Sequence, residues 1–200
     1  MNNSYGIPDH LFNARTGSSG NTWTLATRLG DLLKEMEYRY GPRESGWTLL
    51  GVEFNNGAPQ VWFPGGFEQP PRRHIAIKLS RDAFVEEKRA VYQLAHECVH
   101  LLAPVKFGNA KVIEEGLATA FSEDILEMWF GDQNKAAYTS DSRYRDAALH
   151  VRQLLQLEPD AIRSLRRVEP AFSSMTAATF DHAGLGTVPQ PLIAELLRIF

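Results

Sequence analysis

The segment that most constrains this chain is His96-Glu97-Cys98-Val99-His100, an HExxH sequence. In an α-helix, residues four positions apart lie one above the other, so a helical segment would direct both imidazoles at a single metal ion. Glu97 is rotated by about 100° around the helix axis, where its carboxylate can take a proton from a water that the metal activates. The segment therefore predicts half of a zinc site, with His96 and His100 as ligands and Glu97 as general base.

The residues around the motif favour a helix that runs through a protein interior. An apolar stripe faces away from the imidazoles and comprises Val91, Ala95, Cys98 and Leu102. We expect the helix to begin near Asp82, as its N-cap, and to stop at Pro104. The single cysteine of the chain lies on the apolar stripe, so we expect a buried thiol rather than a ligand.

A catalytic zinc ion usually takes a third protein ligand and leaves the fourth position to water. The residues from Asn109 to Gly131 predict a second helix, because the first is a good capping residue and the last a typical helix end. Its apolar stripe consists of Ile113, Leu117, Phe121, Ile125 and Met128. Glu115 lies on a different face, and a carboxylate there would complete a His/His/Glu site if the two helices pack together.

An HExxH helix followed by a helix with the sequence Glu115-Gly116-Leu117-Ala118 resembles the gluzincins, a clan of metallopeptidases with the zincin fold. In that clan a Glu from a following helix is the third zinc ligand, and in its aminopeptidase branch this Glu is similarly followed by Gly, an apolar residue and Ala. The resemblance covers about a third of the chain at most. It implies Zn²⁺ as cofactor, His96, His100 and Glu115 as ligands, and hydrolysis of peptide bonds with Glu97 as general base.

The sequence also departs from the family pattern. Fourteen residues separate the second histidine from Glu115, fewer than is usual in thermolysin-like enzymes and aminopeptidases, so the connection must be tight. Glu114 is the alternative third ligand, and Glu115 is favoured because it precedes the glycine as in the family motif. Thr119 stands where thermolysin-like enzymes have an Asp that orients a metal-bound imidazole. We expect another side chain to take that role, with Glu123 and Asp124 as candidates.

The remaining patterns predict an α+β chain. Other helices are expected at 22–40, 147–157, 160–167 and 191–200, and strands at 47–54, 60–63 and 74–80. Asn55-Asn56-Gly57, between the first two strands, predicts a β-hairpin. We expect one domain over residues 1–200 with a zincin-like fold, in which a small twisted mixed sheet packs on the HExxH helix and the C-terminal half is mainly helical. Residues 1–21 are expected to form a loose arm.

Substrate contacts can be proposed in the same way. In zincins an edge strand above the metal pairs with extended peptide, and the strand at 74–80 is a candidate because it directly precedes the motif helix. The loop at 65–69, Gly-Gly-Phe-Glu-Gln, resembles the Gly-x-Met-Glu-Asn segment with which family aminopeptidases hold a substrate's amino terminus, although Met and Asn are replaced. The candidate donors to the developing oxyanion are Tyr138, Tyr144, His150 and His182.

Composition narrows the possible partners. A net charge of −3, a pI of about 6.1 and the lack of a long basic block argue against a nucleic-acid partner. The single cysteine, the absence of a membrane-length apolar stretch and an N-terminus without signal-peptide character favour a cytoplasmic protein with a peptide or protein substrate.

Two other functions remain open. One is a cytoplasmic regulatory HExxH protease that acts on a single protein partner, and the other is a catalytically silent zincin-fold protein that binds a peptide or partner. Glu97 favours chemistry over the silent alternative. A purely structural zinc site has no need of a base beside its ligands and is more often closed by a fourth Cys or His.

Overall fold

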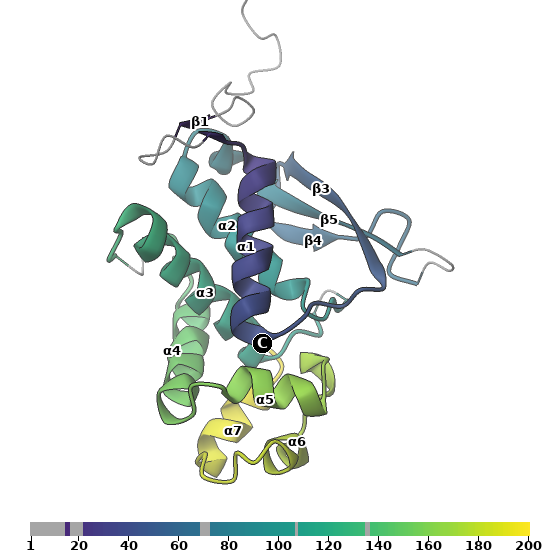
Figure 1. The fold of residues 1–200 in the computed structure, drawn as a ribbon, viewed down its shortest axis with the longest axis vertical. Helices are drawn as coiled ribbons and strands as arrows, with labels where there is room; N and C mark the ends of the chain where they lie inside the picture. Colours follow the sequence, from purple (N-terminus) through teal and green to yellow (C-terminus); the bar gives the residue numbers. More distant parts are fainter. Residues whose placement is uncertain (1–14, 17–21, 69–72, 107, 135–136) are drawn as a thin grey trace, which may run out of the picture.

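The computed structural model describes residues 15–16, 22–68, 73–106, 108–134 and 137–200. They form an α+β fold in which seven α-helices accompany a three-stranded mixed sheet (Figure 1). This confirms the predicted class at the level of a small mixed sheet in a mainly helical chain. Most of the predicted loose arm lies outside the described residues, but β1 (Arg15–Thr16) within it pairs antiparallel with β2 (Thr22–Trp23).

The three-stranded sheet has the order β3-β5-β4, with β3 at Trp47–Asn55, β4 at Gln60–Trp62 and β5 at Arg73–Ser80. The central strand β5 is parallel to β3 and antiparallel to β4. The prediction of a hairpin at 55–57 is therefore wrong, as is the candidacy of 74–80 for the edge. The turn itself forms, because the Asn55 side chain accepts the Gly57 N–H. However, Ile75, Ile77 and Leu79 of β5 are almost fully buried, and this burial explains why β5 lies at the centre of the sheet.

The two helices of the motif region begin later than predicted. Asp82 lies within a 3₁₀ turn, Arg81–Phe84, whose N-cap is Ser80, and α2 spans Glu87–His100. The 3₁₀ turn is separate from α2 and is anchored to the core: Ala83 is buried, and the Phe84 ring stacks on Phe54 with centroids 4.0 Å apart. Likewise, α3 spans Val112–Phe130 and does not start at Asn109, but it ends as predicted at Gly131, which has the left-handed conformation.

The structure has a helix at each of the other predicted positions, 22–40, 147–157, 160–167 and 191–200, with ends that differ from the prediction by up to five residues. The helices are α1 (Leu25–Tyr40), α4 (Ser142–Leu157), α5 (Ala161–Val168), α6 (Ala177–His182) and α7 (Gln190–Leu197). The short α6 was not predicted, and a capping box between Thr176 and Thr179 fixes its start. Among the described helices, none has both the length and the apolar character needed to cross a membrane.

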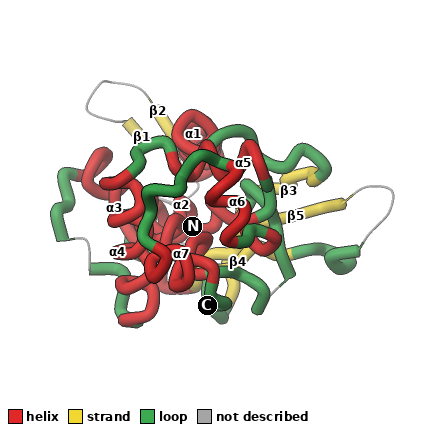
Figure 2. Tube along the Cα trace, turned by 90° about the horizontal axis from the view of Figure 1, so that it is seen from below, coloured by secondary structure: helices red, strands yellow, loops and turns green. Residues whose placement is uncertain are grey.

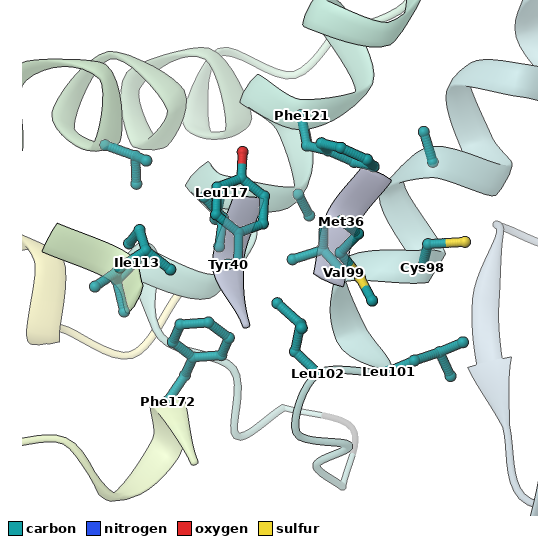
Figure 3. Packing of buried hydrophobic residues seen from close by; sticks show 14 of the residues in the cluster. Met36, Tyr40, Cys98, Val99, Leu101, Leu102, Ile113, Leu117, Phe121 and Phe172 are labelled. Atoms are coloured by element: carbon teal, nitrogen blue, oxygen red, sulfur yellow. The ribbon is translucent and has the colours of Figure 1, made fainter. Parts of the chain in front are cut away.

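The layers of the fold place α2 at the centre. Figure 2 shows α2 between the sheet on one side and α3 and α4 on the other, and Figure 1 shows α5, α6 and α7 gathered at the end far from β1. Side chains of α1, α2 and α3 meet in one buried cluster (Figure 3), in which Tyr40 and Phe121 make an edge-to-face contact at 5.9 Å. Cys98 is fully buried, as predicted. The shared core fixes α2 against α3, the two helices on which the predicted ligands lie.

Candidate metal centre

Two imidazoles of α2 and one carboxylate of α3 converge on a single point. The Oε2 atom of Glu115 lies 3.2 Å from Nε2 of His96 and 3.7 Å from Nε2 of His100. The three donor atoms all lie within 4.8 Å of one another. Ligands about 2.0–2.1 Å from a tetrahedral zinc ion are about 3.4 Å apart, which is close to the separations of 3.2 and 3.7 Å between the carboxylate and the two imidazoles. The donor types, two imidazoles and a carboxylate, are also those of catalytic zinc sites.

Gly116, the residue after Glu115, allows α4 to approach the site. A β-carbon at this position would lie 2.3 Å from the carbonyl oxygen of Ala147 and 2.8 Å from a methyl group of Val151, both in α4. Only glycine permits this approach of the two helices. The close packing brings Tyr144, in the first turn of α4, to within 5.8 Å of the His96 ring, measured between centroids.

Glu114 lies behind His100 rather than beside Glu115. Its side chain is fully buried, and its Oε1 atom accepts a hydrogen bond from Nδ1 of His100 at 2.8 Å. A carboxylate that holds Nδ1–H fixes the tautomer in which Nε2 is free to bind a metal. Glu123 and Asp124, the residues considered for this orienting role, instead each pair with Arg152 at 2.9 Å.

Glu97 lies at the floor of the site with only 3% of its surface exposed. Burial raises the pKa of its carboxyl group, although the nearby imidazoles of His100 and His96 act in the opposite direction. The carboxylate also accepts a hydrogen bond from the backbone N–H of Val61, in the edge strand β4. Glu97 is thus held between α2 and the sheet, with a proton affinity above that of an exposed glutamate.

The cluster of ionisable groups at this site, His96, His100, Glu97, Glu114 and Glu115, is rich in negative charge. Burial alone would lower the pKa of His100, but the carboxylates of Glu115, Glu114 and Glu97 raise it to about 10. Burial alone would raise the pKa of Glu115, but the imidazoles of His100 and His96 lower it to about 2. Three carboxylates around two imidazoles therefore favour a positive charge at the point where the donor atoms meet, which suits a divalent cation.

Two cavities meet at the cluster, with volumes of about 490 and 330 Å³. Four residues line both of them: Pro59, His96, Glu97 and Tyr144. The larger one, called here the aromatic lobe, has a wall formed by Val61, Trp62, Phe63, Phe67 and Phe200. The smaller one, called here the polar lobe, is lined by Arg89, Gln93, Tyr138, Thr139, Ser140 and Asp141. The two lobes thus adjoin at His96, Glu97 and Tyr144, and together they are called here the cleft.

Of the four predicted oxyanion donors, Tyr144 lies closest to the cluster. Burial, Glu115 and Glu97 raise its pKa to about 12, so its hydroxyl remains protonated and can donate. Tyr138 lines only the polar lobe, where its hydroxyl binds Glu86. His150 and His182 are among the described residues but line neither lobe.

Sequence reasoning missed several residues of the cleft, and Val61 and Phe200 are two of them. The sequence pattern predicts that Val61 lies in a strand, but it does not predict the hydrogen bond from its backbone N–H to Glu97. Phe200 reaches the cleft through an antiparallel bridge between Lys111 and Ile199, and its N–H donates to the carbonyl oxygen of Ala110. No local pattern marks such a contact, because it joins segments that are far apart in the chain.

We compared the chain with models of known protein families, with curated proteins and with solved structures, and no match was found. The geometry of the site is therefore the basis for assigning a function. It combines three donors spaced for one metal ion, a buried carboxylate beside them and a tyrosine hydroxyl at the same point of an open cleft.

Proposed function

We propose that this chain is a zinc-dependent peptidase of the gluzincin type with a zincin-like fold. The observation that carries the proposal is the convergence of His96, His100 and Glu115, with donor atoms 3.2 and 3.7 Å apart, beside the buried carboxylate of Glu97. Zn²⁺ bound to these three residues would polarise a substrate carbonyl and make a water molecule nucleophilic near neutral pH.

The protein side chains supply the proton transfers and hold the substrate. Glu97 accepts the proton of the attacking water and returns it to the amine that leaves, a task suited to a carboxyl group whose pKa burial has raised. The protonated hydroxyl of Tyr144 donates to the oxyanion that develops on the substrate carbonyl. Both residues line both lobes, which supports a scissile bond that lies between the lobes.

The edge strand β4 supports a peptide as the substrate. It is the terminal strand of its sheet, so one of its sides is not paired with another strand of that sheet. Residues 58–63 line the cleft on both sides of Glu97. An extended polypeptide can form a few main-chain hydrogen bonds with this short edge, while its side chains enter the two lobes.

The decisive experiment measures metal content and cleavage on the same samples. The full-length protein should bind about one zinc ion per chain and cleave members of a peptide library, as detected by mass spectrometry. Glu97→Gln should keep the zinc and lose activity by at least about 10²-fold, because the amide cannot accept the proton. His96→Ala and Glu115→Ala should lose the zinc.

Chelator-treated protein with restored zinc is the control for this experiment. A zinc-loaded protein that cleaves nothing in the library would refute the peptidase and favour a silent partner-binding protein. An active Glu97→Gln variant would show that Glu97 is not the general base. Full zinc content in Glu115→Ala would show that Glu115 is not a zinc ligand.

A further inference from the structure

Resting on the proposed peptidase function, we infer that this protein is an endopeptidase that selects a large apolar side chain next to the scissile bond. Two observations carry the inference, the pairing of the charged groups along the cleft and the shape and composition of the aromatic lobe. Neither depends on the identity of the metal ligands.

The cleft extends to both sides of the reacting groups. The aromatic lobe of about 490 Å³ and the polar lobe of about 330 Å³ share His96, Glu97 and Tyr144, so each lobe begins at the place where the bond is broken. Both volumes lie within the range of ligand-binding pockets, roughly 300–1,000 Å³. A polypeptide can therefore occupy the cleft before and after the bond that is cleaved.

An exopeptidase must also hold a charged chain end close to the scissile bond, which requires an opposite charge that is not already neutralised. Outside the reacting cluster, every charged side chain among the described residues that line the two lobes has an oppositely charged partner. The pairs are Lys106 with Glu68 at 2.5 Å, Arg143 with Asp141 at 2.8 Å, and Arg89 with Glu86 at 2.9 Å.

Glu68 is the most informative of these groups. It belongs to the loop whose sequence resembles the segment that binds an amino terminus in aminopeptidases, of which Gln69 lies outside the described residues. Here Glu68 binds Lys106, and this contact lowers the pKa of its carboxyl group. Outside the reacting cluster, the described residues of the lining thus offer a chain end no charged side chain that lacks an oppositely charged partner, whereas an internal peptide segment brings no terminal charge to the cleft.

The aromatic lobe fits a large apolar side chain. Phe63 and Phe67 contact each other with centroids 5.0 Å apart, and each also contacts Trp47, at 5.0 and 5.3 Å. On the side nearest the cluster, the Phe200 ring lies 4.6 Å from that of Tyr144. Mutual ring contacts hold this wall in place, and an aromatic or long aliphatic side chain that enters it removes apolar surface from water.

The test uses peptides that are acetylated at the N-terminus and amidated at the C-terminus, so that neither end carries a charge. The zinc-loaded full-length protein should cleave them internally, and one consistent side of the cleaved bond should carry a Phe or Leu. In a matched series that varies only this position, kcat/KM should be at least about tenfold higher for Phe than for Ala or Asp.

Two variants link this preference to the lobe. Phe67→Ala should reduce the ratio of kcat/KM for Phe over Ala peptides by about threefold or more, because it removes one ring of the wall. Tyr38→Ala is the matched control, since Tyr38 is 75% exposed on α1 and lines neither lobe, and it should leave the ratio unchanged. An unchanged ratio in Phe67→Ala would overturn the role of the lobe.

The outcomes separate this inference from the proposed function. If peptides with free ends are cleaved and blocked peptides are not, the protein is an exopeptidase; the inference fails and the peptidase function stands. If the zinc-loaded protein cleaves neither kind, the proposed function itself fails. Internal cleavage without preference for apolar residues would overturn the assignment of specificity to the aromatic lobe.

Discussion

Adjacent glutamates in the first turn of α3 have different roles around the same imidazole. Glu115 faces Nε2 of His100 at 3.7 Å, whereas Glu114 accepts the hydrogen bond from Nδ1 on the far side of the ring at 2.8 Å. Successive helical residues point about 100° apart, which allows one turn to reach both sides of a ring. His100 is therefore held in position by α3 before any metal binds.

Removing the carboxylate of Glu114 should weaken zinc binding. Because Nδ1 of His100 would lose its acceptor, we expect Glu114→Ala to raise the Kd for zinc by about 10–100-fold, as measured by competition with a chromophoric chelator. Glu114→Gln retains one acceptor oxygen and should bind zinc more tightly than Glu114→Ala. Equal affinity of wild type and both variants would show that His100 does not depend on Glu114.

Zinc binding should also release protons. The carboxylates of Glu115, Glu114 and Glu97 overcome the effect of burial and raise the pKa of His100 to about 10, so below that pH the metal-free protein carries a proton that zinc must displace. The affinity for zinc should therefore rise with pH from 7 towards about 10. Calorimetric titrations at pH 8 in buffers of different ionisation enthalpy should show at least about one proton released, and heats independent of the buffer would contradict the prediction.

Residue types were easier to predict than residue positions. His96 and His100 follow from their spacing in one helix, which is a local property. The choice between Glu114 and Glu115 depends on how α3 is rotated against α2, and the choice of Tyr144 among four donors depends on where α4 crosses the site. Both are tertiary properties that a single sequence does not encode locally.

At the scale of elements, the contact between α3 and α4 determines how closely Tyr144 approaches the cluster. Gly116 makes this contact possible, because a β-carbon there would lie 2.3 Å from a backbone carbonyl oxygen of α4. Backbone cannot move aside as the end of a long side chain can. A larger residue would therefore displace the whole of α4, together with its tyrosine.

Gly116→Ala should destabilise the protein by about 1–3 kcal/mol and also reduce turnover, because α4 must shift. Gly30→Ala is the matched control, since Gly30 lies within α1 with nothing within 4 Å of an added β-carbon. It should stabilise the protein by up to about 1 kcal/mol through helix propensity. Urea unfolding gives both values, and similar midpoints for the two variants would refute the role of the close contact.

Elements were predicted better than their pairing. The helices α1 and α4 and the end of α3 follow from apolar spacing and capping residues, which act within a few positions of the chain. The prediction of a hairpin at 55–57 was wrong because a favourable turn sequence does not determine which strands pair. That choice depends on the burial of β5, which lies later in the chain and separates β3 from β4.

Across the whole molecule, the buried side chain of Arg166 joins the helices of the C-terminal half to those of the site. From α5, its guanidinium donates to the carbonyl oxygens of Tyr40 at 2.8 Å, Pro42 at 2.7 Å and Leu102 at 3.1 Å. These oxygens belong to the ends of α1 and α2 and the chain beyond them. Burial lowers the pKa of Arg166 to about 10, so the group remains charged at neutral pH.

Arg166→Met should lower the free energy of unfolding by about 3 kcal/mol, because it leaves several buried carbonyl oxygens without a donor. Arg167→Met is the control, because Arg167 is exposed and its replacement should change stability by no more than about 0.5 kcal/mol. Denaturant titrations of both variants compare these effects. Equal stability of the two would show that Arg166 does not join the two halves.

The shortness of β4 has a consequence for what the protein can hold. The strand spans three residues, and prolines at positions 59 and 64, which have no N–H to donate, lie close to its two ends. The edge of β4 therefore offers few backbone groups with which a strand of another protein molecule could extend the sheet, which limits aggregation. By the same limit, a passing chain gains little from its backbone alone, and its residence time in the groove depends on whether its side chains suit the lobes.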